Sequence, residues 1–331
     1  MIIRNTDGRQ MLRWMEDLWD YPRSITGHGT RSTLEYLKNI NPDLNIHSFK
    51  SGTRVFDWDI PDEWNIYDAY IEHESGQKFA EFTKNNLHVL GYSIPCDIRL
   101  PLSELLPHIY TQSDQPDVVP YVTSYYNDNW GFCMSEKDKQ EMPDGMYHAV
   151  IDANKSPGTL ELADLVIKGE SSKEIFFSTY VCHPSMANNE LSGPVLATAL
   201  IQYIKSKYKK LKYTYRFVFV PETIGSITYL SQHLKYLQDK VICGFNLSCV
   251  GDDRAYSHIE SRMGNTLADN ALKSALIGLD NVVNYSFLER GSDERQYCAP
   301  GVDLPLCGFC RTKYGEYPEY HTSADNFDVV T

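Results

Sequence analysis

The chain has 331 residues, of which 42% are hydrophobic, and a formal net charge of −13. This length allows one large α/β domain together with a second, smaller module. No apolar run of about 18 residues suggests a membrane span, and no block of Lys and Arg suggests nucleic-acid binding. The N-terminus also lacks the pattern of a signal peptide. We therefore expect a cytoplasmic protein that binds neither membranes nor nucleic acids.

Eight cysteines are scattered along the sequence, and several lie in apolar runs such as VICGFNLSCV. In a chain without a secretion signal, buried free thiols are the better interpretation. Cys307 and Cys310 form a lone CxxC pair, whereas a structural zinc site would need a second pair at suitable spacing. The cysteines therefore predict neither a disulfide framework nor a zinc ribbon.

The first half of the chain predicts helices followed by strands. Apolar residues recur at helical spacing over residues 8–22, and a second short helix is predicted over 30–39. The sequence then alternates like strands joined by turns, and between about 85 and 165 prolines recur among short aromatic, β-like pieces. We expect an N-terminal helical part at 1–50 and an inserted β-rich module at 51–165.

Strands and helices alternate after residue 166, which is the expected main part of the catalytic domain, 166–331. Strands are predicted at 173–181, 213–222, 240–251, 283–290 and 303–310, and helices at 193–210, 226–239 and 265–279. Apolar strands that alternate with helices are buried on both faces. The predicted fold is therefore an α/β three-layer sandwich, with a mainly parallel central sheet flanked by helices and a small inserted β-rich domain.

Four polar segments follow predicted strands or lie near the chain end, where the ligand sites of such sheets are found. They are Cys182-His183 with the loop to Glu190, Pro221-Glu222-Thr223, Gly251-Asp252-Asp253 and Tyr320-His321-Thr322. Histidines and carboxylates could hold a zinc ion and leave one position for water, while a further carboxylate removes a proton from that water. Each segment also has a simpler explanation. Glu190 and Glu222 could stabilise helix N-termini, and Asp252-Asp253 could be a polar turn.

The same segments resemble the zinc-dependent aminopeptidases of the phosphorylase/hydrolase-like fold. The matching strings are STYVCHPSMANNELSGP, FVFVPETIGS, GSDERQYCAPGVDLP and EYHTSADNFD, in the order of that family. The strings YPRSITGHGTR and FDWDIPDEWNI are closer to a bacterial subgroup, the polysaccharide-biosynthesis proteins with an aminopeptidase-like domain. The resemblance implies a zinc hydrolase in which Glu222 is the general base and His321 is the last metal ligand.

The sequence departs from the two-zinc pattern at three ligand positions. Alignment on Ser192-Gly193 places Asn189 at the bridging Asp, Thr223 at the second Glu and Ser248 at the later Asp. Amides and hydroxyls are poor zinc ligands, so we expect one zinc ion at most.

The expected ligands of this ion are His183, Glu190 and His321. Asn189, Asp252 and Asp293 are expected to support these ligands or to replace one of them. Arg295, Tyr297 and Tyr320 are expected to contact substrate. Arg295 could pair with a substrate carboxylate, and Tyr297, Tyr314 and Tyr320 could form the pocket wall.

The sequence thus predicts a hydrolase that cleaves an amide bond in a small peptide-like or aminoacyl substrate, or on an amino-sugar precursor. Two alternatives remain open. The three absent carboxylates suggest a non-catalytic binding protein on an aminopeptidase scaffold, and the aromatic-rich β-like segment at 85–165 suggests a regulatory or assembly component that uses it as an interaction surface. A homo-oligomer is also left open.

Overall fold

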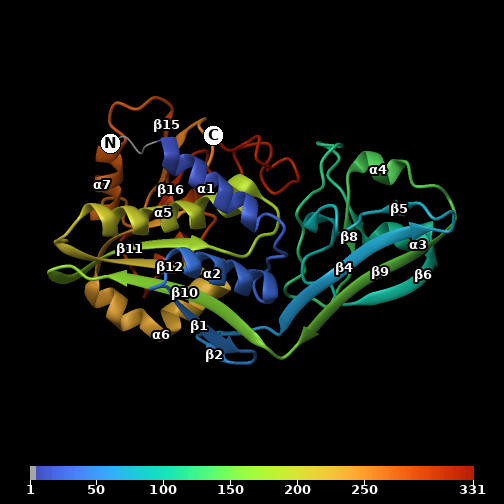
Figure 1. The fold of residues 1–331 in the computed structure, drawn as a ribbon, viewed down its shortest axis with the longest axis horizontal. Coiled ribbons are helices and arrows are strands. Elements are labelled where there is room, and N and C mark those ends of the chain that lie inside the picture. The colour runs from blue at the N-terminus through green and yellow to red at the C-terminus, as the bar shows by residue number, and fades with distance from the viewer. Residues whose placement is uncertain (1–4) are drawn as a thin grey trace.

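The computed structural model describes residues 5–331, which form a large sheet with helices on its faces and a smaller sheet beside it (Figure 1). The large sheet has eight strands, in the spatial order β1-β10-β12-β11-β13-β16-β14-β15. In that order they are Asn45–Lys50, Thr159–Ile167, Tyr213–Val220, Ser171–Tyr180, Val241–Leu247, Leu306–Cys310, Tyr256–Ile259 and Val282–Tyr285.

The large sheet is mixed, so the prediction of a mainly parallel sheet is not confirmed. β12, β11, β13 and β16 are parallel, whereas β1, β10 and β14 each pair antiparallel with a neighbour. Only residues 168–170 join β10 to β11. Because a parallel connection needs a crossover of a dozen or more residues, this short link makes β10 run opposite to β11.

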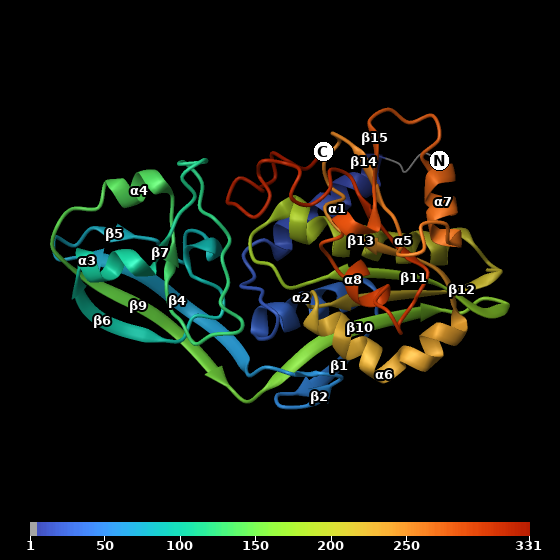
Figure 2. The same ribbon diagram turned by 180° about the vertical axis from the view of Figure 1, so that it is seen from behind.

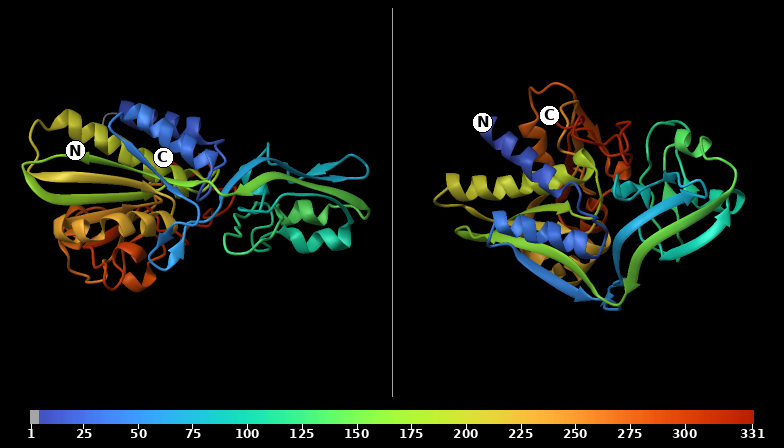
Figure 3. Two further views of the ribbon diagram at one scale, coloured as in Figure 1. Left: turned by 90° about the horizontal axis from the view of Figure 1, so that it is seen from below. Right: turned by 45° about the vertical axis from the view of Figure 1, so that its right-hand side comes forward.

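Helices cover both faces of the large sheet (Figure 3). One face carries α1 (Asn5–Leu18), α2 (His28–Ile40) and α5 (Ser192–Lys207), and the other carries α6 (Ile224–Lys240) and α8 (Glu294–Tyr297). α7 (Leu267–Ala275) packs on β13, β14 and β16. Successive strand residues point to opposite faces: Phe176 and Val218 enter the core under α6, whereas Phe177 and Phe217 enter the core under α5. Within residues 5–331, no helix combines the length and apolar character needed to cross a lipid bilayer.

The smaller sheet lies at one end of the molecule (Figure 2) and has the strand order β5-β4-β9-β6. These strands are Lys78–Phe79, Glu63–His73, Met146–Ser156 and Cys96–Pro101. The short elements are β2 (Arg54–Val55), β3 (Trp58–Asp59), η1 (Asn86–His88), α3 (Leu102–Leu105), η2 (Leu106–His108), β7 (Ile109–Tyr110), β8 (Phe132–Cys133), α4 (Glu136–Gln140), the π-helical turn η3 (Ala187–Leu191) and η4 (Phe287–Glu289). β10, inside the predicted module 51–165, belongs to the large sheet, and the module boundaries stay a prediction.

Backbone hydrogen bonds tie a loop of the smaller-sheet region to the C-terminal loop of the chain. The N–H of Tyr121 donates to the carbonyl oxygen of His321 at 2.8 Å, and the N–H of Ser323 donates to that of Val119 at 2.8 Å. Pro120 and Thr322 form an isolated antiparallel bridge. This pairing places residues 119–126 over the strand ends of the large sheet, where the polar segments lie.

Candidate active site

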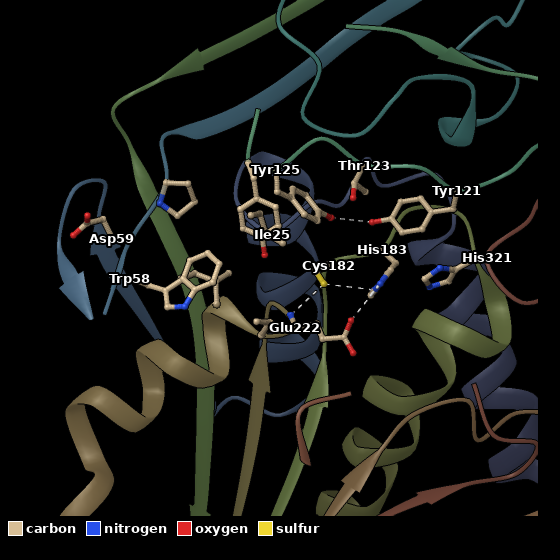
Figure 4. A pocket seen from close by; sticks show the side chains of 14 residues that line it. Ile25, Trp58, Asp59, Tyr121, Thr123, Tyr125, Cys182, His183, Glu222 and His321 are labelled. Atoms are coloured by element: carbon tan, nitrogen blue, oxygen red, sulfur yellow. Dashed lines mark hydrogen bonds and ion pairs between the residues drawn. The ribbon is translucent and has the colours of Figure 1, made fainter. Parts of the chain in front are cut away.

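A cavity of about 310 Å³ lies where β11 and β12 end, beneath residues 119–126 (Figure 4). His183, Glu222 and His321 share its inner wall, so three of the four predicted segments meet here. The full lining is Ile25, Trp58, Asp59, Pro61, Tyr121, Thr123, Tyr125, Tyr126, Cys182, His183, Glu222, Thr223, Ile224 and His321.

The His183 ring is held by Glu190. β11 ends at Tyr180, and the π-helical turn η3 points Glu190 back toward the strand end, where it is fully buried. One carboxylate oxygen of Glu190 accepts the backbone N–H of His183 and lies 3.0 Å from its Nδ1. The other ring nitrogen, Nε2, faces the carboxylate of Glu222 at 3.7 Å. Glu190 and Glu222 therefore lie on opposite edges of the imidazole.

Arg23 lies behind this pair and was missed by reasoning from the sequence. It is 1% exposed, its Nε donates to the carbonyl oxygen of His183 at 2.8 Å, and the same Nε lies 3.6 Å from Glu190. The guanidinium thus balances the buried carboxylate that holds His183. The available signal was the string YPRSITGHGTR, in which Arg23 is a charged residue inside a match to relatives.

Glu222 follows β12 and directs its carboxylate into the cavity. Its Oε1 accepts the hydroxyl of Ser292 at 2.7 Å, and its backbone N–H donates to the Cys182 sulfur at 3.2 Å. Burial raises the pKa of Glu222, with the charge of His183 opposing this effect. Thr223, the next residue, has φ 66°, a strained conformation for a β-branched side chain. This turn sets the direction in which Glu222 leaves the strand.

His321 is enclosed by two tyrosines. The Tyr320 ring stacks on it with centroids 3.9 Å apart, and the Tyr121 ring meets it edge-on at 5.1 Å. Its ring centroid lies 5.5 Å from that of His183. Its Nε2 is buried and has no hydrogen-bond partner among residues 5–331. Burial, together with the charge of His183, lowers the pKa of His321 to about 3, so the imidazole is neutral at physiological pH.

The two asparagines that precede Glu190 are anchored by Asp325. The carboxylate of Asp325 accepts the backbone N–H groups of Asn188 at 2.7 Å and of Asn189 at 2.9 Å. The Asn189 amide donates to the hydroxyl of Tyr180, while its Oδ1 is buried with no partner among the described residues. Asn189 therefore offers one unused oxygen next to the ring that packs on His183.

Comparison with known proteins places this arrangement in a family. A family model described as "Domain of unknown function (DUF4910)" matches residues 12–331. The chain belongs to the DUF4910 family. It is 42% identical, over 96% of its length and 73% of the other protein's, to a Clostridium acetobutylicum protein provisionally named as a polysaccharide biosynthesis protein with an aminopeptidase-like domain.

Solved structures share the fold of this DUF4910 chain. The crystal structure of a protein from Clostridium acetobutylicum, provisionally named a peptidase, is 41% identical, with a TM-score of 0.94 over 98% of this chain and 76% of that one. The zinc aminopeptidase BSAP from Bacillus subtilis is 14% identical, with a TM-score of 0.68 over 98% of this chain and 89% of its own. At this low identity, the similarity to BSAP is one of fold.

Two predicted carboxylates of the DUF4910 chain lie outside the cavity wall. Asp252 accepts the Asn188 amide at 3.0 Å and the backbone N–H and hydroxyl of Thr312 at 2.9 and 2.6 Å, which occupies it with structural bonds. Asp293 accepts the backbone N–H of Thr223 at 2.8 Å and lies beneath the turn that carries Glu222. Burial and the nearby Glu222 raise the pKa of Asp293 to about 8.

The predicted substrate-contacting residues are also absent from the cavity lining. Arg295 is exposed and donates to the Thr223 hydroxyl at 3.2 Å. Tyr297 is fully buried and bonds to the hydroxyl of Ser178 at 2.9 Å. Tyr320 supports the back of His321, and the hydroxyl of Tyr314 is bonded to Glu294. The rings that do line the cavity come from residues 58 and 121–126, which the sequence had not marked as part of a site.

Proposed function

We propose that this chain is a metal-dependent hydrolase that cleaves an amide or aminoacyl bond, with Glu222 as the general base. The observation that supports this most strongly is the neutral, buried imidazole of His321, whose Nε2 has no partner among the described residues. It lies beside His183 and Glu222 in one cavity. Unpaired polar atoms in a protein interior are rare and call for an explanation such as an unseen ion.

The two histidines of this cavity fit a single zinc ion on the Nε2 side of His183. His183 and His321 would hold the ion; Asn189, whose buried Oδ1 has no partner among the described residues, is not part of the cavity lining. The Nδ1 side offers another group, because the ligand atoms of Cys182, His183 and Glu190 lie within 4.8 Å of one another. Arg23 already balances Glu190 there, and burial raises the pKa of the Cys182 thiol to about 11, so that side suits a second cation poorly. We therefore assign Glu190 to holding the His183 ring, in place of the ligand role predicted from the sequence.

Glu222 is placed to move a proton in this reaction. A bound zinc ion would supply Lewis acidity, which lowers the pKa of water and polarises a carbonyl. Oε1 of Glu222 is occupied by the hydroxyl of Ser292, so Oε2, which faces His183, is the atom that takes the proton from water. A carboxylate whose pKa is raised by burial is a stronger base than an exposed one, and the same atom can return the proton to the leaving amine.

The substrate proposal rests on the relatives. The names of the similar proteins refer to aminopeptidases and to polysaccharide biosynthesis. A small peptide-like or aminoacyl compound would agree with the first name, and an acylated cell-surface polysaccharide precursor would agree with both. The tests below therefore use both aminoacyl and acylated amino-sugar substrates.

Elemental analysis and activity assays test the proposal. We expect about one zinc ion per chain, lost in His183→Ala and His321→Ala and retained in His148→Ala, a half-buried histidine of the smaller sheet that is paired with Asp97. Glu222→Gln should keep the ion and lower hydrolysis of aminoacyl anilides or N-acylated amino sugars by about 10²–10⁴-fold.

Other outcomes would contradict parts of this proposal. Close to two ions per chain would remove the single-ion assignment. Full activity of Glu222→Gln would remove Glu222 as the base. A chain with neither zinc nor hydrolytic activity, but with specific ligand binding, would instead be a binding protein on an aminopeptidase scaffold. The positions of Asn189, Thr223 and Ser248, where the two-zinc enzymes use carboxylates, favour that second candidate.

A further inference from the structure

The outer wall of the cavity is built from aromatic rings that the proposed chemistry does not use. The rings of Trp58 and Tyr126 lie 5.4 Å apart at 54°, and the Tyr125 ring lies 6.5 Å from that of Tyr126 at 89°. Figure 4 shows Trp58 at the side of the cavity opposite His183 and His321. Tyr126 is 71% exposed, and the buried Tyr92 packs edge-on against Tyr125 from behind. Trp58, Tyr125 and Tyr126 therefore form an aromatic wall on the side of the cavity away from His183 and His321, and Tyr92 supports it from behind.

Polar oxygens alternate with these rings. Asp59, next to Trp58, and Thr123, two residues before Tyr125, both line the cavity; Figure 4 shows Asp59 beside Trp58 and Thr123 between Tyr125 and Tyr121. Asp59 is exposed and pairs through one oxygen with Arg54 at 3.1 Å, which leaves its other oxygen free. An apolar group packed against Asp59 or Thr123 would remove water from their oxygens without replacing the lost hydrogen bonds, which is unfavourable. A ring with hydroxyl groups would satisfy them.

Charge restricts the ligand further. The fourteen lining residues include two carboxylates, of Asp59 and Glu222, and neither Lys nor Arg. At the outer wall an anionic group would meet the carboxylate of Asp59, with neither Lys nor Arg among the lining residues, whereas the charge of His183 lies at the inner end beside Glu222. The wall therefore suits an uncharged ligand that presents apolar faces and hydroxyl edges together.

A pyranose ring has that combination, because its axial C–H groups form apolar patches while its hydroxyl groups project from the rim. We propose that Trp58, Tyr125 and Tyr126, with Asp59 and Thr123, form a subsite for a neutral pyranose ring. The C–H patches would pack on the aromatic faces, which carry partial negative charge, and the hydroxyls would bond to Asp59 and Thr123. This proposal rests on the proposed function, since it places the sugar part of the substrate in the cavity whose inner end would carry the reaction.

Ligand-observed NMR titrations on the 331-residue chain carrying Glu222→Gln test the subsite without turnover. The probes are N-acetylglucosamine, glucuronate and L-leucinamide. We expect N-acetylglucosamine to bind at least about tenfold more tightly than glucuronate, and Trp58→Ala to weaken that binding by at least about tenfold. Tyr208→Ala, which removes an exposed aromatic at the end of α5, should bind as the parent does.

The outcomes separate the subsite from the proposed function. Equal or tighter binding of glucuronate or leucinamide, or sugar binding that survives Trp58→Ala, would overturn the subsite. Absence of sugar binding in a protein that still holds zinc and hydrolyses aminoacyl anilides would overturn the subsite alone. Sugar binding that depends on Trp58, in a protein without zinc or hydrolytic activity, would overturn the proposed function and leave the subsite standing.

Discussion

Replacement of Arg23 by Met should destabilise the protein strongly, because it leaves the Glu190 carboxylate unbalanced in the interior. Both side chains of this pair have no exposed surface. Met keeps much of the apolar volume of Arg but removes the charge and the hydrogen bonds to the carbonyl oxygens of Leu18 and His183. Removing one partner of a buried ion pair costs about 3–5 kcal/mol. We expect the free energy of unfolding to fall by that amount.

Urea unfolding, followed by far-ultraviolet circular dichroism and tryptophan fluorescence, measures the effect by linear extrapolation. The matched control is Arg254→Met, which breaks a partly exposed pair with Glu319 at 2.8 Å and should cost under about 1 kcal/mol. Glu190→Gln added to Arg23→Met should recover about 1–3 kcal/mol relative to the sum of the single changes, because it removes the unbalanced charge. A loss for Arg23→Met no larger than that of the control would refute this reasoning.

Two further substitutions, with one control, probe residues outside the cavity lining. Burial acts to raise the pKa of Asp269, but hydrogen bonds, led by that from His258, outweigh it and lower the pKa below its usual value; this stabilisation is present above about pH 4 and is lost as the pH falls through the folded-state pKa. Asp269→Asn should therefore lower the free energy of unfolding at pH 7 by about 1–3 kcal/mol. In urea unfolding from pH 3 to 7, the variant should also lose less stability as the pH falls. An unchanged loss of stability in acid would count against this prediction. Gly193→Ala should cost about 1–3 kcal/mol or more, since a Cβ there would lie 2.3 Å from the Thr179 hydroxyl. Gly8→Ala in α1, where a Cβ has no neighbour within 4 Å, should leave the melting temperature unchanged or raise it, and equal losses in both variants would contradict the steric argument.

The position of the cavity could be predicted from the sequence because it depends on where strands end. His183 and Glu222 follow neighbouring parallel strands, β11 and β12, so their approach follows from the alternation of strands and helices. Side-chain direction could not be predicted in the same way. Asp252 also follows a strand of this sheet, yet it turns toward Asn188 and Thr312.

A local capping box overrode one prediction made from hydrophobic pattern, and pairing between distant segments overrode another. The strand expected over 283–290 ends at Tyr285, because Ser286 and Glu289 form a capping box that begins the short helix η4. The sequence of β10 resembles a continuation of the β-rich region. The strand nevertheless belongs to the large sheet, because it pairs with β12, about 50 residues further along the chain. Pairing between distant segments leaves no periodic trace in a single sequence.

The aromatic residues that line the cavity could not be predicted from the sequence either, because their position also depends on contacts between distant segments. Tyr121 and Tyr125 lie among many prolines and aromatics between residues 85 and 165, and no spacing rule distinguishes them there. Their place in the cavity depends on contacts with the loop that carries His321, about 200 residues further along the chain.

Residues 119–123 pair with residues 321–323 through the main chain. The inner donors of the cavity and the loop above them should therefore tolerate substitution to different degrees. His183, Glu222 and His321 sit on or next to the large sheet, where small changes displace several packed neighbours. The loop 119–126 is joined to the C-terminal loop by main-chain hydrogen bonds, which depend little on side-chain identity, and its last residue, Tyr126, is 71% exposed. A substitution at Tyr126 should therefore alter the outer end of the cavity and leave the inner donors in place.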